Sequence, residues 1–159
     1  MYKRQVERWF FDRIVHNRPI PLPGDGSTIT QLGHVEDLAE AMARCIDVDA
    51  AANRTYNCSG KQGISFRGLI RAAAVACGRD PDGLELRSFN PSDLDPKARK
   101  AFPLRLNHFL TDITRVEREL AWQPSFDLAK GLADSYSNDY ALNPTAAPDF
   151  SSDEALIGT

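Results

Sequence analysis

The sequence of 159 residues has few cysteines, and their spacing excludes two kinds of protein. Cys45, Cys58 and Cys77 are its three cysteines; they lie far apart and form no C-x-x-C pair. An odd number of widely separated cysteines argues against a disulfide framework and against a zinc site. We therefore predict small buried thiols in a protein of a reducing compartment.

A charge excess and a long apolar run are also lacking. The chain has 19 basic and 22 acidic residues, a formal net charge of −3 and a pI near 5.6, so nucleic acid would need a local basic patch. No stretch approaches the roughly 18 consecutive apolar residues of a membrane span, and no signal-peptide pattern opens the sequence. We predict a soluble protein of the cytoplasm without a membrane partner.

The two ends of the chain differ in composition from its middle. Residues 1–5 resemble the translated end of a sequencing adapter, and we interpret them as non-native rather than as a basic turn of helix. Residues 143–159 are dominated by Pro, Ala, Ser and Asp, which bury too little apolar surface to fold, so we predict a disordered tail. Residues 6–142 have an ordinary globular composition and form one domain.

Hydrophobic periodicity within this domain predicts alternating helices and short strands, an α/β fold. Pro21 and Pro23 confine the first strand to the margin of a sheet. Trp9, Phe10, Trp122 and Phe126 are assigned to the core. The predicted helices cover residues 6–17, 35–46, 66–77, 111–120 and 127–140, and the predicted strands cover residues 20–23, 29–33, 54–58 and 84–89.

The block from residue 24 to residue 41 is the most informative part of the sequence. It joins a turn, Gly24-Asp25-Gly26, to His34 and an acidic first helical turn containing Glu36 and Asp37. Carboxylates at a helix N-terminus complement the helix dipole, so we interpret both as structural. His34 either lines a substrate cleft or caps the helix, and we favour the cap.

Three segments, in this order, resemble the extended short-chain dehydrogenase/reductases, the NAD-dependent epimerase/dehydratase family. They are residues 24–41, then Thr55-Tyr56-Asn57-Cys58, and finally Asp112-Ile113-Thr114-Arg115 followed by Glu119-Leu120-Ala121-Trp122-Gln123-Pro124. The resemblance implies a C-terminal substrate-binding lobe with the last elements of a Rossmann-like sheet, and a missing N-terminal nucleotide-binding part. It also implies a nucleotide-sugar substrate.

The sequence departs from this family at the position of a phosphate-clamping Arg-Asp pair. Thr30 and Gln31 stand there, and neither can form a bidentate ion pair with a phosphate. Arg105 lies near a second phosphate-contacting region of the family. The substrate-binding candidates are therefore Thr30, Gln31, His34 and Arg105.

The family's cofactor and catalytic motifs are also missing. The chain has no Gly-x-x-Gly-x-x-Gly turn, and none of its four tyrosines has a lysine four residues later. We therefore predict no catalytic, cofactor-binding or metal-binding residue, and a fragment that is inactive alone. The resemblance implies that the full-length parent binds NAD or NADP, and that a homo-oligomer would form through the missing N-terminal half.

A mixed basic and aromatic segment resembles the chloroplast stem-loop-binding branch of the same family and its cyanobacterial relatives. It consists of Leu94-Asp95-Pro96-Lys97-Ala98-Arg99-Lys100-Ala101-Phe102-Pro103, followed by His108-Phe109. The resemblance implies a location in the cytoplasm of a bacterium, for example a cyanobacterium, or in the plastid stroma of a eukaryote. That branch is associated with RNA binding and cleavage, and cations beside rings suit phosphates and stacked bases. A solvated loop is the alternative interpretation, and Asp93, Asp95 and Asp112 weaken the local positive electrostatic potential. The sequence thus supports two hypotheses, a truncated NAD(P)-dependent sugar-nucleotide enzyme and a non-redox RNA-binding or RNA-processing protein. The RNA-contact candidates are Lys97, Arg99, Lys100, Phe102, Arg105, His108 and Phe109.

Overall fold

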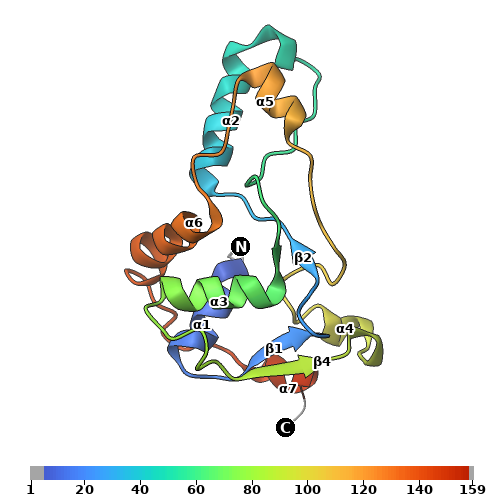
Figure 1. Cartoon of the computed structure of the whole chain (residues 1–159), viewed down its shortest axis with the longest axis vertical. Coiled ribbons are helices and arrows are strands. Elements are labelled where there is room, and N and C mark those ends of the chain that lie inside the picture. Colours follow the sequence, from blue (N-terminus) through green and yellow to red (C-terminus); the bar gives the residue numbers. More distant parts are fainter. Residues whose placement is uncertain (1–5, 158–159) are drawn as a thin grey trace.

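The computed structural model describes residues 6–157, so the segment interpreted as adapter-derived lies outside the described residues (Figure 1). No helix in this range is long and apolar enough to cross a membrane. The strands are β1 (Ile20–Pro23), β2 (Ile29–Thr30), β3 (Ile64–Ser65) and β4 (Leu86–Phe89). The α-helices are α1 (Val6–Val15), α2 (Val35–Asp47), α3 (Phe66–Ala76), α4 (Pro96–Arg99), α5 (Thr114–Leu120), α6 (Leu128–Asp134) and α7 (Ser151–Ile157), with short 3-10 turns at Asp49–Ala51 and Pro91–Asp93 and a π-helix at Ser135–Tyr140.

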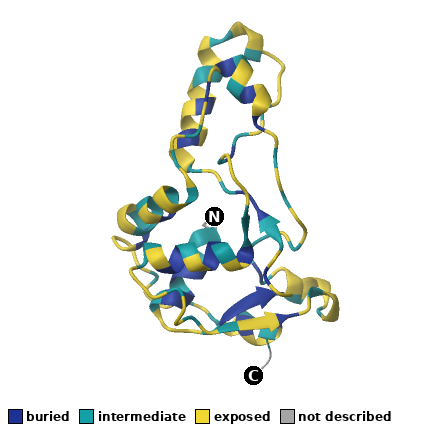
Figure 2. Ribbon diagram, in the orientation of Figure 1, coloured by how far each residue is buried: buried dark blue, intermediate teal, exposed yellow. Residues whose placement is uncertain are grey.

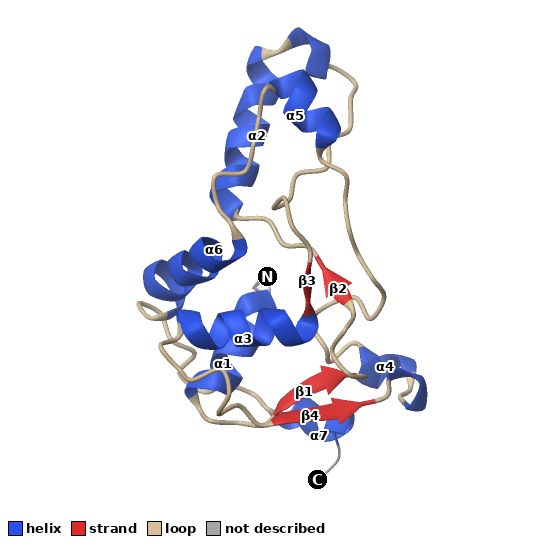
Figure 3. Cartoon of the chain, in the orientation of Figure 1, coloured by secondary structure: helices blue, strands red, loops and turns tan. Residues whose placement is uncertain are grey.

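Two small sheets organise the strands (Figure 3). β1 runs parallel to β4, with Ile20 opposite Leu86, and β2 runs antiparallel to β3, with Ile29 opposite Ser65. A parallel pair needs a long crossover, and here the chain from β2 to α3 supplies it. The arrangement is the predicted α/β class, with a parallel sheet that matches part of a Rossmann-like fold.

The main core lies where α1 and α3 pack beside β1. Phe10, Phe11, Ile20, Phe66 and Ile70 are fully buried there. Figure 2 shows this buried region in the lower part of the molecule. Trp9 and Phe126, which we also predicted to be core residues, are only partly buried, whereas Trp122 is fully buried in a second cluster.

The second cluster joins α2 to α5, which lie side by side at the far end of the molecule from β1 and β4 (Figure 1). Its buried members are Ala41, Ile113, Val116, Leu120 and Trp122, and we call it the arm cluster. Partly buried Tyr56 and Cys58 pack against it. The arm cluster is much smaller than the main core, so this end of the molecule has little internal packing of its own.

Side-chain acceptors cap the starts of three helices, and at His34 this is the cap that we favoured from the sequence. Ser65 accepts a hydrogen bond from the Gly68 N–H at 3.1 Å, and Asp127 accepts one from the Lys130 N–H at 2.8 Å. His34 stands at the N-cap of α2, where its Nδ1 accepts from the Glu36 N–H at 3.4 Å. Such side-chain acceptors satisfy N–H groups that have no partner inside the helix.

The prediction of a disordered tail is wrong for residues 151–157. These residues form α7, which packs against β1 and β4. The Arg13 guanidinium binds the buried Asp153 carboxylate, with its Nε 3.1 and 3.2 Å from the two oxygens, and Leu156 is buried in the main core. Composition averaged over the tail hides these two distant attachments, which order it.

The predicted strand at residues 54–58 is also not formed in the structure, since no other strand pairs with it. Other elements differ mainly in their ends. The helix predicted from residue 111 begins at Thr114, and the last predicted helix divides into α6 and the π-helix. The three cysteines are free thiols, but each is only partly buried rather than fully buried.

Candidate functional site

Exposed cations and two rings gather on α4 and the loop that follows it. We call Lys97, Arg99, Lys100, Arg105, His108 and Phe109 the basic surface; all are exposed except Phe109, which is partly buried. The Arg105 guanidinium lies over the Phe109 ring, 4.2 Å from its centroid. An arginine stacked on an aromatic ring is held by a cation–π interaction, and its remaining N–H groups can still bind an anion.

Pairing with β2 holds this ring pair in place. The Phe109 N–H donates to the Ile29 carbonyl at 2.9 Å, and the Ile29 N–H donates to His108 Nδ1 at 3.1 Å. Because both bonds join the same residue of β2, the loop that carries Arg105 is attached to a strand rather than free.

Phe102 does not belong to this surface. Its ring is only 4% exposed and packs against Trp9, Phe10, Phe66 and Phe89. This packing contradicts the prediction that Phe102 contacts RNA, because a ring buried among other rings cannot stack on a base. The sequence cannot separate it from Phe109, which stands in the same segment.

Two of the nearby acidic residues have local hydrogen-bond partners. Asp95 accepts hydrogen bonds from the Lys97 and Ala98 N–H groups at 2.7 and 2.9 Å, and these bonds lower the pKa of Asp95. Asp93 accepts from the side chain of Asn90 at 3.1 Å. Residues 93–109 therefore carry four cations against two carboxylates that have local partners.

Thr30 and Gln31 are buried and used within the protein. Thr30 is a residue of β2. Gln31 Oε1 accepts from the Thr111 N–H at 2.7 Å, and its Nε2 donates to the Gly60 carbonyl at 2.6 Å. The Gln31 side chain thus links three loops, and both its oxygen and its nitrogen are hydrogen-bonded within the protein.

His34 and Asp37 form a connected structural group at the start of α2. The His34 ring stacks on Phe126 with centroids 3.7 Å apart, and its Nε2 lies 3.2 Å from the Asp134 carboxylate. Asp37 accepts hydrogen bonds from the Ser125 N–H and hydroxyl at 2.8 and 2.7 Å and from the Phe126 N–H at 3.2 Å. Burial alone would raise the pKa of Asp37, but these bonds and the nearby His34 outweigh it and lower the pKa. His34 caps α2 and also lines the large cleft described next, so this geometry fits both interpretations of His34.

A large cleft of about 950 Å³ lies beside this group. Glu7, Asp127, Asp134 and Asp139 line it, and among its described lining residues Lys61 is the one lysine or arginine. A dinucleotide or sugar-nucleotide pyrophosphate placed here would face mainly carboxylates, so these residues do not fit one. Sequence reasoning missed the cleft because its lining comes from four separate segments with no common motif.

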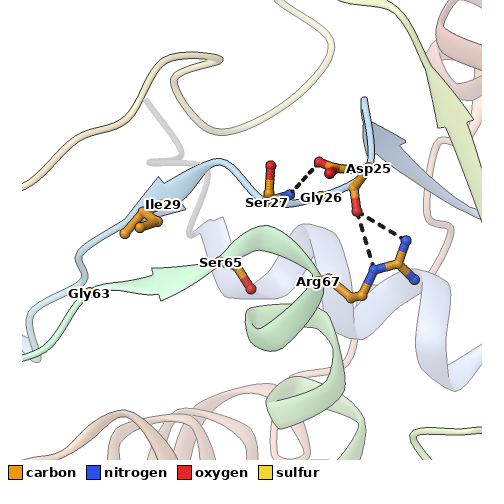
Figure 4. A pocket seen from close by; sticks show the side chains of 7 residues that line it. All are labelled: Asp25, Gly26, Ser27, Ile29, Gly63, Ser65 and Arg67. Atoms are coloured by element: carbon orange, nitrogen blue, oxygen red, sulfur yellow. Dashed lines mark hydrogen bonds between the residues drawn. The ribbon is translucent and has the colours of Figure 1, made fainter.

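A shallower pocket of about 370 Å³ lies at the Gly24-Asp25-Gly26 turn (Figure 4). Gly26 has a positive φ of 78°, and a Cβ there would lie 2.8 Å from Leu22, so this turn requires glycine. The Arg67 guanidinium donates twice to the Asp25 carbonyl, at 3.0 and 3.2 Å, and the Ser27 N–H donates to the Asp25 carboxylate. The Asp25 carbonyl and carboxylate are thus engaged by Arg67 and Ser27 around the turn itself.

Comparison with known proteins identifies relatives of the chain. The model of the NAD dependent epimerase/dehydratase family matches residues 3–59. The chloroplast stem-loop binding protein of 41 kDa b from Arabidopsis thaliana is 39% identical over 153 residues, which are 96% of this chain and 40% of that protein. The dTDP-glucose 4,6-dehydratase of Streptomyces griseus is 29% identical over 124 residues, which are 78% of this chain and 34% of that protein.

A solved structure supports the same fold. The UDP-glucuronic acid 4-epimerase of Bacillus cereus, in complex with UDP-glucuronic acid and NAD, superposes with a TM-score of 0.68 at 14% identity, over 87% of this chain and 40% of that one. The chain spans about two fifths or less of the length of these relatives. The family model, the shared sequence and the shared fold together show that this chain belongs to the NAD-dependent epimerase/dehydratase family and corresponds to part of the family fold.

Proposed function

We propose that this chain binds structured RNA through the basic surface. It would then be part of a non-redox RNA-binding or RNA-processing protein built on the epimerase/dehydratase fold. The observation that carries the proposal is the Arg105–Phe109 pair, an exposed guanidinium over a partly buried ring, in the same segment as the exposed Lys97, Arg99 and Lys100. Cations that bind phosphates and a ring that can stack on an unpaired base are the two elements that RNA-binding surfaces combine.

The relative that matches almost the whole chain supports this proposal. That relative is named as a stem-loop binding protein, and it is 39% identical to this chain over 153 residues. An overall charge of −3 does not oppose binding, because the attraction comes from the local surface and the two carboxylates within it have hydrogen-bond partners.

Sugar-nucleotide chemistry is the second candidate, for a protein that carries the whole family fold. It is favoured by the structural neighbour that holds UDP-glucuronic acid and NAD. Two observations argue against it. The cleft is lined by carboxylates, and Gln31 is hydrogen-bonded within the protein. Gln31 and Thr30 stand where the family has its phosphate-clamping Arg-Asp pair. The proposal accordingly assigns no NAD-contacting residue to this chain.

The experiment is a filter-binding titration of a stem-loop RNA at several salt concentrations. The test variant replaces Lys97, Arg99, Lys100 and Arg105 with alanine. The matched control replaces four other exposed cations, Arg54, Arg79, Arg115 and Arg118, so that both variants lose the same charge. A third variant, Phe109→Leu, removes the ring and keeps an apolar side chain.

The proposal expects a loss of affinity and a flatter salt dependence in the test variant alone. Each phosphate contact that is lost reduces the slope of log affinity against log salt by roughly 0.7 to 0.9, so four lost contacts reduce it by about 3. Phe109→Leu should weaken binding to unpaired loop nucleotides with little change in slope. Equal losses in the test and control variants would mean a nonspecific charge effect and would reject the basic surface.

A further inference from the structure

The shallow pocket of about 370 Å³ at the Gly24-Asp25-Gly26 turn adjoins the basic surface. We call it the turn pocket; besides the turn and Ser27, it is lined by Ile29, Gly63, Ser65 and Arg67 (Figure 4). Ile29 connects the two sites, because it lines the pocket while its main chain binds His108 and Phe109. Leu110 lies so close to Gly63 that a Cβ there would be 2.5 Å from Leu110 Cδ2. An RNA strand on the basic surface therefore lies next to the turn pocket.

The turn pocket presents one carboxylate and one guanidinium, those of the exposed Asp25 and Arg67. Arg67 uses Nε and Nη2 to bind the Asp25 carbonyl, and among the described residues its Nη1 makes no hydrogen bond (Figure 4). The Asp25 carboxylate accepts from the Ser27 N–H at 2.9 Å, and hydrogen bonds from Ser27 lower the pKa of Asp25. Since a carboxylate has about four acceptor positions, this one is charged at neutral pH and can accept further hydrogen bonds.

The backbone N–H groups at the start of α3 are already used within the protein. The Phe66 and Arg67 N–H groups donate to loop carbonyls at 2.9 and 3.1 Å. The Gly68 N–H donates to the Ser65 hydroxyl at 3.1 Å, a bond that leaves the hydroxyl proton of Ser65 available. The pocket therefore offers a ligand the side chains of Asp25, Arg67 and Ser65 rather than the end of a helix.

Guanine matches this combination of charges better than the other three bases of RNA. Its Watson–Crick edge carries two neighbouring donors, N1–H and N2–H, beside the acceptor O6. Two parallel donors can share one carboxylate, and O6 can accept from an arginine. Adenine, cytosine and uracil each have a single donor atom on that edge, so they cannot donate to a carboxylate in this way. A guanine within a duplex has already used these groups, so the ligand must be unpaired.

We infer that the turn pocket binds one unpaired guanine of the RNA that lies on the basic surface. The Asp25 carboxylate accepts from N1–H and N2–H of this base, the Arg67 guanidinium donates to O6, and the partly buried Ile29 provides apolar contact. The pocket volume of about 370 Å³ lies within the roughly 300–1,000 Å³ of small-ligand pockets. The inference rests on the proposed function and adds a base preference, which contacts with phosphates do not provide.

The experiment measures the affinity of the whole chain for stem-loop RNAs with one stem and a loop of uridines that holds a single variable base. That base is guanine, adenine or hypoxanthine, which lacks the N2 amino group of guanine. A competition arm with free guanosine monophosphate distinguishes a guanine within RNA from a free nucleotide. The RNA series uses the parent chain, so it tests the inference even if a variant does not fold.

The test variant is Asp25→Asn, which keeps an acceptor oxygen for the Ser27 N–H but loses the charge. Asp80→Asn is the matched control, because Asp80 is also exposed and accepts from the Asp82 N–H at the same distance of 2.9 Å. Asp80 does not line the turn pocket. The readout is the ratio of affinities for guanine and adenine RNA, since losing a carboxylate strengthens the binding of any RNA in both variants.

We expect the parent chain and Asp80→Asn to bind guanine RNA at least about tenfold more tightly than adenine RNA, and hypoxanthine RNA at least about threefold more weakly than guanine RNA. Asp25→Asn should reduce the ratio of guanine to adenine affinity to below about threefold. Three equal affinities in the parent overturn the inference but leave the proposed function intact, whereas no binding of any RNA overturns both.

Two further outcomes would also overturn the inference. A guanine preference that Asp25→Asn retains would place the base outside the turn pocket. Free guanosine monophosphate that binds as tightly as guanine RNA would show that the ligand is a nucleotide rather than a base held within RNA.

Discussion

Replacing Asp37 with asparagine should destabilise the protein through the loss of one buried negative charge. The Asp37 side chain is buried and accepts three hydrogen bonds from Ser125 and Phe126, while its backbone carbonyl accepts from the Trp122 indole N–H at 2.9 Å. It therefore ties the start of α2 to the turn that precedes α6. Asn keeps the shape and one acceptor oxygen, but it places an NH2 group against N–H donors.

The expected size follows from these three bonds. Hydrogen bonds to a charged group contribute about 1.5–3 kcal/mol each when one partner is removed, and bonds that share one carboxylate are not additive. We expect Asp37→Asn to lower the free energy of unfolding by about 2 kcal/mol, equivalent to about 4–8 °C in Tm for a chain of this size. Asp37→Ala, which leaves the donors without a partner, should lower it by about 4 kcal/mol.

Urea unfolding with Glu36→Gln as the control is the assay. Glu36 is the exposed neighbour in the same helical turn, so its variant loses the same charge near the helix dipole but no buried hydrogen bond. It should change stability by less than about 0.5 kcal/mol. A similar loss in Glu36→Gln and Asp37→Asn would refute the reasoning, because the helix dipole alone would then explain both.

The pH dependence gives a second check on the same carboxylate. The folded pKa of Asp37 lies below its ordinary value of 3.8, so its stabilisation is fully present above that value and is lost as pH falls toward the folded pKa. The difference in stability between the parent and Asp37→Asn should be constant from pH 5 to pH 7, on the scale of about 2 kcal/mol, and should narrow below about pH 4. A difference that stays constant down to pH 3 would show that the charge is not the cause.

Three further perturbations test other parts of the structure. Arg13→Met should cost about 3–5 kcal/mol in urea unfolding by leaving the buried Asp153 carboxylate unpaired, and adding Asp153→Leu should recover part of that loss; no recovery would contradict the pairing. Phe102→Ala should cost about 3–5 kcal/mol and leave the salt slope of RNA binding unchanged, whereas Phe109→Leu should cost little stability. Burial raises the pKa of Cys77 to about 12, so its thiol should react with a disulfide reagent at pH 8 far more slowly in the folded protein than in urea, and equal rates would show that it is accessible.

The sequence predicted the elements whose signals are local. α2 and α3 begin where His34 and Ser65 provide an acceptor, and β4 lies within the predicted alternation. These helix starts could be predicted because a capping residue and its helix are neighbours in the chain, so no distant residue is needed to define them.

The errors occur where a distant residue decides the outcome. Composition predicts disorder after residue 143, but Arg13 provides a partner for Asp153 more than a hundred residues earlier in the chain. Phe102 and Phe109 stand in one segment, and only the ring cluster around Trp9 and Phe10 distinguishes the buried side chain from the accessible one. No local pattern contains that information.

Residues 54–58 are an informative case, because the propensity for a strand is present and the strand is not. Propensity describes how well side chains suit a sheet, but a strand exists only when a neighbour pairs its backbone. Tyr56 and Cys58 already face the arm cluster as a strand would place them. What the segment lacks is therefore a partner strand among the described residues rather than the right sequence. A conflict between local preference and observed structure thus points to backbone pairing, rather than propensity, as the condition that is not met.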